Sequence, residues 1–342
     1  MKILTSLVFL LFLSACQPVD PVQQQINSSI EFAPPTGFTR AFSPKPYNFT
    51  RAYATQGKPV RFGEYSERFE LRDGDCDVTN CSSPRARAEI QRDADFIKAN
   101  VGDDIWYAWS FYNQSIPSFT AKNSLRLVFG QWTMGGQRPA IFRLMQVGQD
   151  EVNFAGCDPT VCSNIFPVRG DVVLQLDDIA KTYKWGESQN NGNICRLFDM
   201  TAARGQWVDL TVNTNFSTGD DGYLRVWVNG QLVCSYSGPI VSQASVLERS
   251  GNKPEHRRGI FSTWTNRWKG ATGGAAIPTM VAYYDGFRFG SSFAEVNAPF
   301  DQDGQTEQSS NSLATRPDNS EKAGAFAKGA AQLFKKSIFP RF

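Results

Sequence analysis

The stretch GYLRVWVNGQLVC, residues 222–234, decides the fold class of this sequence. Two apolar runs flank the dipeptide Asn229-Gly230. Asn-Gly between two such runs is the strongest short signal for a β-hairpin, because both residues tolerate the positive φ angles of a type I′ turn. We therefore predict two antiparallel strands here, joined by a two-residue turn.

Other segments have the same short, β-rich character. Residues 106–112 (WYAWSFY), 125–129 and 140–147 read as strands, and long amphipathic helix patterns are almost absent. Many short strands with Gly and Pro turns are typical of a sandwich or jelly roll. We predict one all-β domain, a concanavalin-like β-jelly-roll sandwich over residues 46–295, a length that suits a single domain of this type.

The N-terminal end predicts export. A short positive start and an apolar run, residues 3–13, precede Leu13-Ser14-Ala15-Cys16, which resembles the lipobox of bacterial lipoproteins. We expect a signal peptide at 1–15 and lipidation of Cys16, with an ordinary signal peptide as the alternative. By the same resemblance, Gln17 favours an outer membrane lipoprotein that faces the periplasm or the cell surface.

The regions beside the predicted domain are polar. Residues 16–45 are rich in Pro, Gln and Ser and are expected to form a flexible tether. Residues 296–342 are expected to be a disordered tail, with a weak amphipathic helix near the end as the alternative. No other stretch approaches the roughly 18 apolar residues of a transmembrane helix.

The cysteine count agrees with export. Seven cysteines become six once Cys16 is assigned to the lipid. Cys76 and Cys81 enclose one loop, and Cys157 and Cys162 enclose another of the same length. We predict these two local disulfides and a third between Cys195 and Cys234, all of which require an oxidising compartment. A zinc site is the competing interpretation, but the spacing is four residues instead of two.

Composition restricts the partners. The net charge is +2 and 20% of the residues are charged, so the composition lacks the excess of positive charge that is typical of nucleic-acid-binding proteins. We expect a monomer with no bound metal and no cofactor, although structural calcium at 73–75 or 219–222 fits those acidic turns as well as turn chemistry does.

One charged strand is the first candidate for a site. Arg85, Arg87 and Glu89 alternate with Ala86, Ala88 and Ile90, so the two sets should project to opposite sides of a strand. Arginine's planar fork matches a carboxylate in bidentate fashion, which suits an acidic ligand. A solvent-facing ladder of Arg-Glu pairs is the alternative.

Three more segments, 128–133 (VFGQWT), 257–261 (RRGIF) and 281–290 (VAYYDGFRFG), follow in order, with 205–210 (GQWVDL) and the Asn229-Gly230 hairpin between them. Together with the Arg-Glu strand, this set resembles jelly-roll polysaccharide lyases of the heparin lyase I-like and glucuronan lyase-like type. The resemblance extends from about residue 62 to 290 and rests on order and spacing, because each motif is short.

The resemblance implies β-elimination on an anionic, uronic-acid-containing polysaccharide. It implies that Arg85, Arg87 and Gln131 neutralise the uronate carboxylate, with Arg257 where the family commonly has a lysine. Glu89, Trp132, Arg143 and Trp264 are candidates for substrate binding.

Two departures from the family pattern concern proton transfer. Thr133 stands where a Gln-x-His pattern has histidine, and Phe261 stands where a Lys-x-Gly-x-Tyr pattern has tyrosine. Tyr283 is the phenol that we select as a replacement, although a packed tyrosine is the more ordinary interpretation. His256, the single histidine, should point away from Arg257 and is expected to be structural.

Three functions remain open from the sequence. A polysaccharide lyase with a modified active site is the leading hypothesis, and a non-catalytic glycan-binding lipoprotein on the same fold is the second. A retaining glycoside hydrolase would need two carboxylates about 5 Å apart. The sequence contains no run of the Glu-x-Asp-x-x-Glu type that commonly supplies them.

Overall fold

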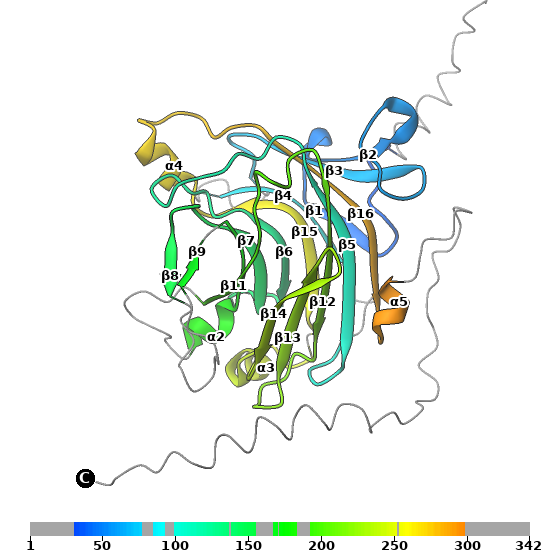
Figure 1. Ribbon diagram of the computed structural model, residues 1–342, viewed down its shortest axis with the longest axis vertical. Helices are drawn as coiled ribbons and strands as arrows, with labels where there is room; N and C mark the ends of the chain where they lie inside the picture. Colours follow the sequence, from blue (N-terminus) through cyan, green and yellow to red (C-terminus); the bar gives the residue numbers. More distant parts are fainter. Residues whose placement is uncertain are drawn as a thin grey trace, which may run out of the picture. The chain divides into compact units, whose positions relative to one another are not determined.

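A computed structural model describes residues 31–76, 85–92, 99–136, 138–154, 167–169, 171–182, 192–251 and 253–297 (Figure 1). It contains two seven-stranded antiparallel sheets and one small two-stranded sheet. The first sheet runs in the order β1 (Phe38–Phe42), β4 (Ala86–Arg92), β15 (Glu255–Ser262), β6 (Val128–Thr133), β7 (Phe142–Gln146), β10 (Val172–Gln175) and β11 (Asn193–Phe198). The second sheet runs in the order β14 (Gln231–Ser237), β13 (Tyr223–Val228), β12 (Trp207–Thr214), β5 (Ile105–Asn113), β16 (Met280–Gly290), β3 (Tyr65–Leu71) and β2 (Phe49–Tyr53).

The remaining elements are short. The small sheet pairs β8 (Val152–Phe154) with β9 (Pro167–Arg169). The helices are η1 (Pro46–Asn48), η2 (Ala54–Gln56), α2 (Asp177–Thr182), α3 (Gln243–Glu248), α4 (Thr265–Ala271) and α5 (Phe293–Asn297). The architecture is an all-β, two-sheet sandwich of the jelly-roll type, as the sequence predicted.

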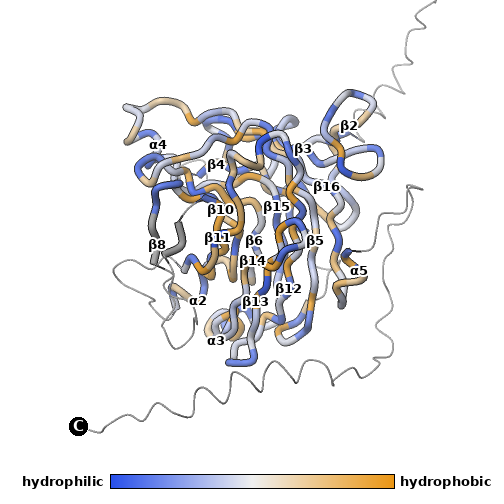
Figure 2. Tube along the Cα trace, viewed as in Figure 1, coloured by the Kyte–Doolittle hydropathy of each residue, from blue (hydrophilic) through white to orange (hydrophobic). Residues whose placement is uncertain are grey.

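The core lies between the two large sheets. Ala88 and Ile90 of β4 belong to one buried cluster with Trp109 and Phe111 of β5, which is in the other sheet. In the hydropathy colouring, β10 and β11 are largely hydrophobic (Figure 2). Burial of a large apolar side chain contributes about 1.5–3 kcal/mol, so this interior holds the two sheets together.

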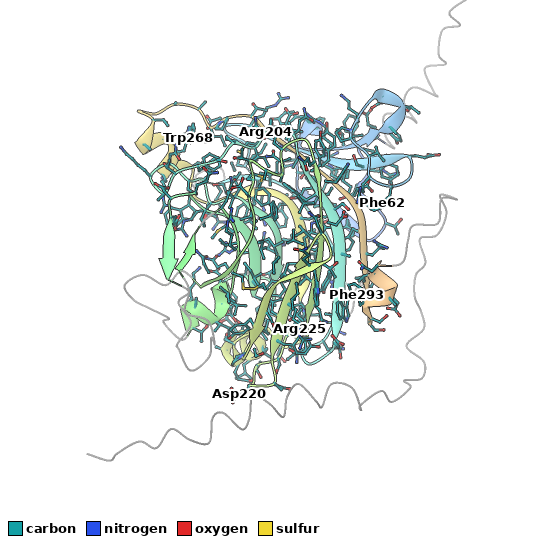
Figure 3. The ribbon with its side chains drawn as sticks, in the orientation of Figure 1. Phe62, Arg204, Asp220, Arg225, Trp268 and Phe293 are labelled. Carbon is teal, nitrogen blue, oxygen red and sulfur yellow. A yellow bond between two sulfur atoms is a disulfide. The ribbon has the colours of Figure 1, made fainter. Side chains whose placement is uncertain are left out.

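The predicted hairpin is confirmed. β13 and β14 pair antiparallel, and Asn229 and Gly230 between them have φ angles of 50° and 77°. Both angles are positive, as a type I′ turn requires. In the turn before β13, Asp220 lies at the opposite end of the sandwich from Trp268 of α4 (Figure 3).

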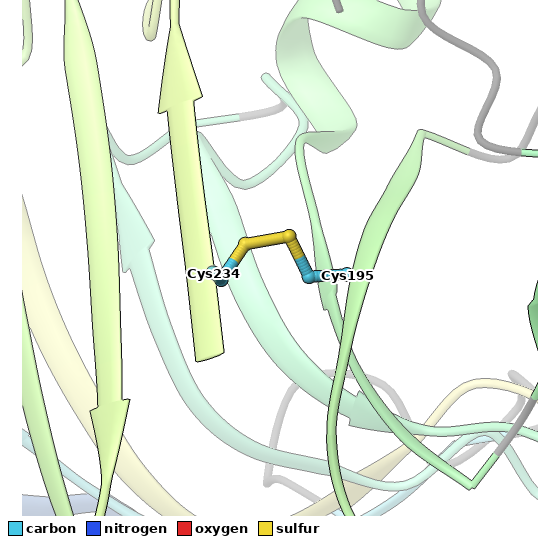
Figure 4. The surroundings of a disulfide bond; sticks show 2 residues. All are labelled: Cys195 and Cys234. Carbon is cyan, nitrogen blue, oxygen red and sulfur yellow. A yellow bond between two sulfur atoms is a disulfide. The ribbon is translucent and has the colours of Figure 1, made fainter. Parts of the chain in front are cut away.

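One predicted disulfide joins the edges of the two sheets. Cys195 of β11 is bonded to Cys234 of β14, with their Cα atoms 5.6 Å apart (Figure 4). Cys76 is also disulfide-bonded. Its expected partner Cys81 lies outside the described residues, as do Cys16, Cys157 and Cys162.

The sandwich begins earlier than the sequence predicted. β1 falls inside the segment 16–45 that was assigned to a tether, and it pairs with β4 through Phe38↔Arg92 and Thr39↔Gln91. The segment was assigned to a tether because it is rich in Pro and Ser, and this composition gave no sign of the short edge strand β1. The expected signal peptide and nearly all of the expected tail lie outside the described residues. Within those residues, no helix has the length and apolar character needed to cross a membrane.

Candidate functional site

Strand β4 carries a fully buried carboxylate on the face of the first sheet that is turned away from the core. We call this the outer face. Arg87 Nε donates to Glu89 Oε2 at 2.6 Å. Gln131 Nε2 of β6 lies 2.9 Å and 3.1 Å from the two oxygens of the same carboxylate. The expected alternation is confirmed, because Ala86, Ala88 and Ile90 are in the core cluster.

Polar residues form a line across five neighbouring strands of the first sheet, β4, β15, β6, β7 and β10. Arg257 of β15 is the direct cross-strand partner of both Gln91 of β4 and Gln131 of β6. The line continues through Arg143 of β7 to Gln175 of β10. We call these residues the polar row: Gln91, Arg257, Gln131, Arg143 and Gln175. Direct cross-strand partners have Cβ atoms about 4.5–5.5 Å apart, so neighbouring members can bind one ligand.

Arg257 is the first cation of the polar row and lies between Gln91 and Gln131. Its guanidinium lies 3.5 Å from Glu255, with 16% of the side chain exposed. Burial and the neighbouring Arg87 lower the pKa of Arg257, while Glu89 and Glu255 counteract them. An arginine stays protonated under such shifts. Arg257 therefore offers an incompletely neutralised positive charge to an anionic ligand.

Arg143 is the second cation of the row and is more firmly held. It forms an ion pair with Asp177 at the start of α2. Asp177 also lies 3.3 Å from Lys181, one turn further along the helix. This arrangement fixes the position of the guanidinium, because the carboxylate is itself anchored by α2.

A second line on the same face is apolar. Phe261 of β15 pairs with Val128 of β6, which pairs with Met145 of β7, which pairs with Val173 of β10. We call these four residues the apolar row. Together with Val147 they form one buried hydrophobic cluster, separate from the main core.

Arg87 of β4 is the cross-strand partner of Phe261 and closes the apolar row. Its guanidinium carbon lies 4.5 Å from the ring centre of Phe261 and 3.6 Å from that of Phe42 in β1. Two aromatic rings and Glu89 therefore hold Arg87, and cation–π contacts of this kind are worth up to about 2 kcal/mol when desolvated.

Gly259 lies between the two rows on β15, opposite Glu89. Its φ angle is 137°, and a Cβ atom here would stand 2.2 Å from the carbonyl oxygen of Ala88. Only glycine fits this close approach of two strands.

The structure separates two predicted residues from this face. Trp132 is fully buried in the core, where it stacks on Phe142 at 4.3 Å, so the prediction that it binds sugar is wrong. It must point inward because its neighbour Gln131 points outward. Tyr283 lies in the second sheet, in a cluster with Ala52 and Val281 that is separate from the core between the sheets. It therefore cannot replace a proton carrier beside Arg87.

Two further candidates lie next to the rows. Arg85 immediately precedes β4 and is half-buried, on the same side as Arg87 by strand alternation. Trp264 follows β15 and is 41% exposed. Arg267 and Arg126 lie 4.2 Å and 5.2 Å from its ring centre.

His256 is a core residue, as expected. It is fully buried and stacks on Phe287 at 4.9 Å, beside Trp132. Burial lowers the pKa of His256 far below its usual value, with Arg258 and Arg92 acting in the same direction. A neutral imidazole on the inner side of the sheet has no access to a ligand on the outer face.

The two positions that depart from the family pattern lie on the outer face without a free proton carrier. The Thr133 hydroxyl accepts a hydrogen bond from the backbone N–H of Gly135 at 2.9 Å. Phe261 has no polar atom. Tyr284 is close in sequence to the site motifs but is buried, with its hydroxyl 2.7 Å from the carbonyl oxygen of Gly259.

Sequence reasoning missed Glu255, Gln91 and Phe42. Strand alternation could have placed Glu255 and Gln91 on the outer face, because each is two residues from a predicted outer-face residue on the same strand. Phe42 lay in the segment assigned to a tether, so nothing local pointed to its contact with Arg87.

The acidic turns considered for calcium have protein partners. Asp75 Oδ2 accepts hydrogen bonds from Asn48 Nδ2 at 2.9 Å and from the backbone N–H of Arg72 at 2.8 Å. Asp221 accepts one from the hydroxyl of Ser217 at 2.5 Å. Within the described residues, no group of three or more His, Cys, Asp or Glu side chains is placed to hold a metal ion.

A family model described as polysaccharide lyase matches residues 36–288. Among solved structures, an endo-β-1,4-glucuronan lyase from the fungus Trichoderma reesei has a TM-score of 0.42 and 12% identity, covering 76% of this chain and 97% of its own. An alginate lyase of polysaccharide lyase family 7 has a TM-score of 0.41 and 11% identity, covering 73% and 84%. A cellulose-induced protein has a TM-score of 0.38 and 10% identity, covering 75% and 90%. No curated protein matches the sequence. Likenesses of this size transfer no substrate and no residue role to this chain.

Proposed function

The chain belongs to the polysaccharide lyase family, and we propose that it cleaves a uronic-acid-containing polysaccharide by β-elimination on the outer face of the first sheet. The observation that carries the proposal is the polar row, which places Arg257 and Arg143 on either side of Gln131. Guanidinium and amide groups are the donors that a sugar carboxylate accepts best.

β-Elimination makes three demands on such a face. The carboxylate must be neutralised so that the C5 proton becomes acidic, a base must take that proton, and the leaving oxygen must receive one. Arg257 and Gln131 suit the first demand, because they are direct cross-strand partners. Glu89 orients Gln131, since it accepts from the amide nitrogen at 2.9 Å.

Arg87 has a different role in this proposal from the one that the sequence suggested. It is 93% shielded by its surroundings, bonded to Glu89 and flanked by Phe42 and Phe261. We assign it to holding Glu89, while the more exposed Arg257 contacts the polymer.

The test is to incubate the purified protein with glucuronan, polymannuronate, heparin and chondroitin while recording ultraviolet absorbance. Each cleavage by β-elimination creates a conjugated unsaturated uronate that absorbs there. A steady rise with one polymer is the expected result. A flat trace with every polymer, from folded protein, would contradict lyase activity on these uronates.

A second candidate is glycan binding without cleavage. Two positions favour binding without cleavage. The Thr133 hydroxyl accepts a hydrogen bond from the backbone N–H of Gly135, and Phe261 has no hydroxyl. Retention of an acidic polymer on immobilised protein, together with a flat absorbance trace, would establish this function.

We also propose that the protein acts in the cell envelope, anchored through Cys16. The Leu-Ser-Ala-Cys sequence supports this, and the Cys195–Cys234 disulfide is consistent with an oxidising compartment. Metabolic labelling with a fatty acid should label the wild-type protein in bacterial cells and should not label Cys16→Ser. Equal labelling of both proteins would contradict the anchor.

A further inference from the structure

A β-eliminating site needs a base, and carboxylates are the titratable acids beside the polar row. Within the described residues, Glu89 lies beneath the row, Asp177 beside Arg143, and Glu255 beside Arg257. Histidine is excluded, because His256 lies in the core.

Two of these carboxylates already form hydrogen bonds and ion pairs with other side chains of the protein. Both oxygens of Glu89 lie within 3.1 Å of Gln131 Nε2, one of them also accepts from Arg87, and the side chain is completely buried. Asp177 is shared between Arg143 and Lys181 and is 7% exposed. Neither can approach a sugar carbon without breaking these contacts.

Glu255 differs in its contacts. Its side chain is 18% exposed and its ion pair with Arg257 is long, at 3.5 Å. Gln91 donates to the same oxygen, Oε2, at 3.1 Å. Oε1 is left without a hydrogen bond in the described part of the chain, so it can accept a proton from a ligand.

The position of Glu255 also fits the reaction. It is the direct cross-strand partner of Thr133, and Thr133 is two residues from Gln131 on the same face. A ligand carboxylate on Arg257 and Gln131 would therefore have Glu255 at its side. Glu255 and Thr133 lie on the side of the polar row that is turned away from the apolar row, and Thr133 offers no base there.

We propose that Glu255 is the catalytic base of this site and that it also carries the proton to the leaving oxygen. The inference rests on the proposed lyase function. Glu255 removes the proton from C5, the C4=C5 double bond forms, and the C4–O4 bond breaks. The same carboxyl then delivers its proton to O4, so no other reactant is needed.

One carboxyl can do both steps only when the C5 hydrogen and O4 lie on the same side of the sugar ring. This holds for mannuronate and glucuronate. It does not hold for guluronate or galacturonate, in which the two groups lie on opposite sides. The inference therefore predicts cleavage of polymannuronate or glucuronan, with little cleavage of polyguluronate or polygalacturonate.

The test compares the purified wild-type protein with Glu255→Gln, Glu255→Asp and the control Glu248→Gln on these four polymers. Glu248 of α3 forms a more exposed ion pair, with Arg138. We expect Glu255→Gln to lower kcat by about 100-fold or more with KM changed less than threefold, as loss of a general base does. Glu255→Asp should retain part of the activity, and Glu248→Gln all of it.

The outcomes separate the two proposals. A wild-type protein that cleaves a polymer while Glu255→Gln cleaves it equally well overturns Glu255 as the base and leaves the lyase function standing. The same holds if the wild-type protein cleaves polyguluronate or polygalacturonate as readily as polymannuronate. A wild-type protein that cleaves none of these four polymers, and neither heparin nor chondroitin, overturns both proposals.

Discussion

The polar row and the apolar row are carried by the same strands and differ in what surrounds them. Arg257 and Arg143 of the polar row keep about one sixth of their side chains exposed. Val128, Met145 and Val173 of the apolar row are at most 3% exposed. The two rows of the outer face therefore have different roles. The polar row can bind a ligand, and the apolar row holds the Arg87 side chain in place. Four predictions test this division, from the largest expected effect to the smallest.

The first prediction concerns Glu89, which connects the two rows. Glu89→Ala removes the acceptor of Arg87 Nε and Gln131 Nε2 in a buried place. Removing one partner of a buried ion pair costs about 3–5 kcal/mol, so we expect a loss of that size in the free energy of unfolding. Urea denaturation measures it.

The control for this prediction is Glu248→Ala, which breaks a partly exposed pair with Arg138. Its loss should stay at or below about 1 kcal/mol. Equal losses for the two variants would mean that Glu89 does not connect the rows energetically.

The second prediction concerns the polar row itself. Arg257→Ala should lower kcat/KM by about 100-fold, the size of effect seen when one preorganised donor to a developing oxyanion is lost. The free energy of unfolding should fall by less than for Glu89→Ala, because the Arg257 side chain is 16% exposed and its ion pair with Glu255 is long, at 3.5 Å. Steady-state kinetics on the polymer that the wild-type protein cleaves gives the first value.

Arg196→Ala is the matched control, since Arg196 of β11 is an exposed arginine of the same sheet. It should keep wild-type kcat/KM. A similar loss of activity in both variants would point to general charge attraction instead of a defined contact at Arg257.

The third prediction concerns the apolar row. Val173→Ala removes two buried methyl groups, which are worth about 1.5 kcal/mol in the free energy of unfolding. Activity at a temperature where the variant is folded should not change. Val233→Ala, at an exposed position of β14, should be close to neutral. A fall in kcat/KM for Val173→Ala, with stability preserved, would place the apolar row in the ligand-binding part of the face.

Local patterns in the sequence predicted much of this arrangement. The Asn229-Gly230 turn and the alternation over residues 85–90 depend on neighbouring residues alone, and the structure has both. The sequence could also have shown that Trp132 does not bind sugar. Once Gln131 is assigned to the outer face, strand alternation places its neighbour Trp132 in the core. Tyr283 could not be placed from sequence, since alternation gives its side of a strand but does not say which sheet that strand joins. Phe42 reaches Arg87 through pairing between β1 and β4, which is 44 or more residues away along the chain from β1.

The last prediction places a phenol between the two rows. Phe261→Tyr would add a hydroxyl to the ring that lies beside Arg87. If Glu255 supplies the base, this variant should change kcat less than about threefold, because the proton already has a carrier. Its stability should fall by about 1–3 kcal/mol, since Phe261 is nearly buried and the new hydroxyl loses water. Kinetics and urea denaturation of the same preparation give both values. A large gain in kcat would show instead that the wild-type site lacks a proton carrier, and that the apolar row occupies the place where one would act.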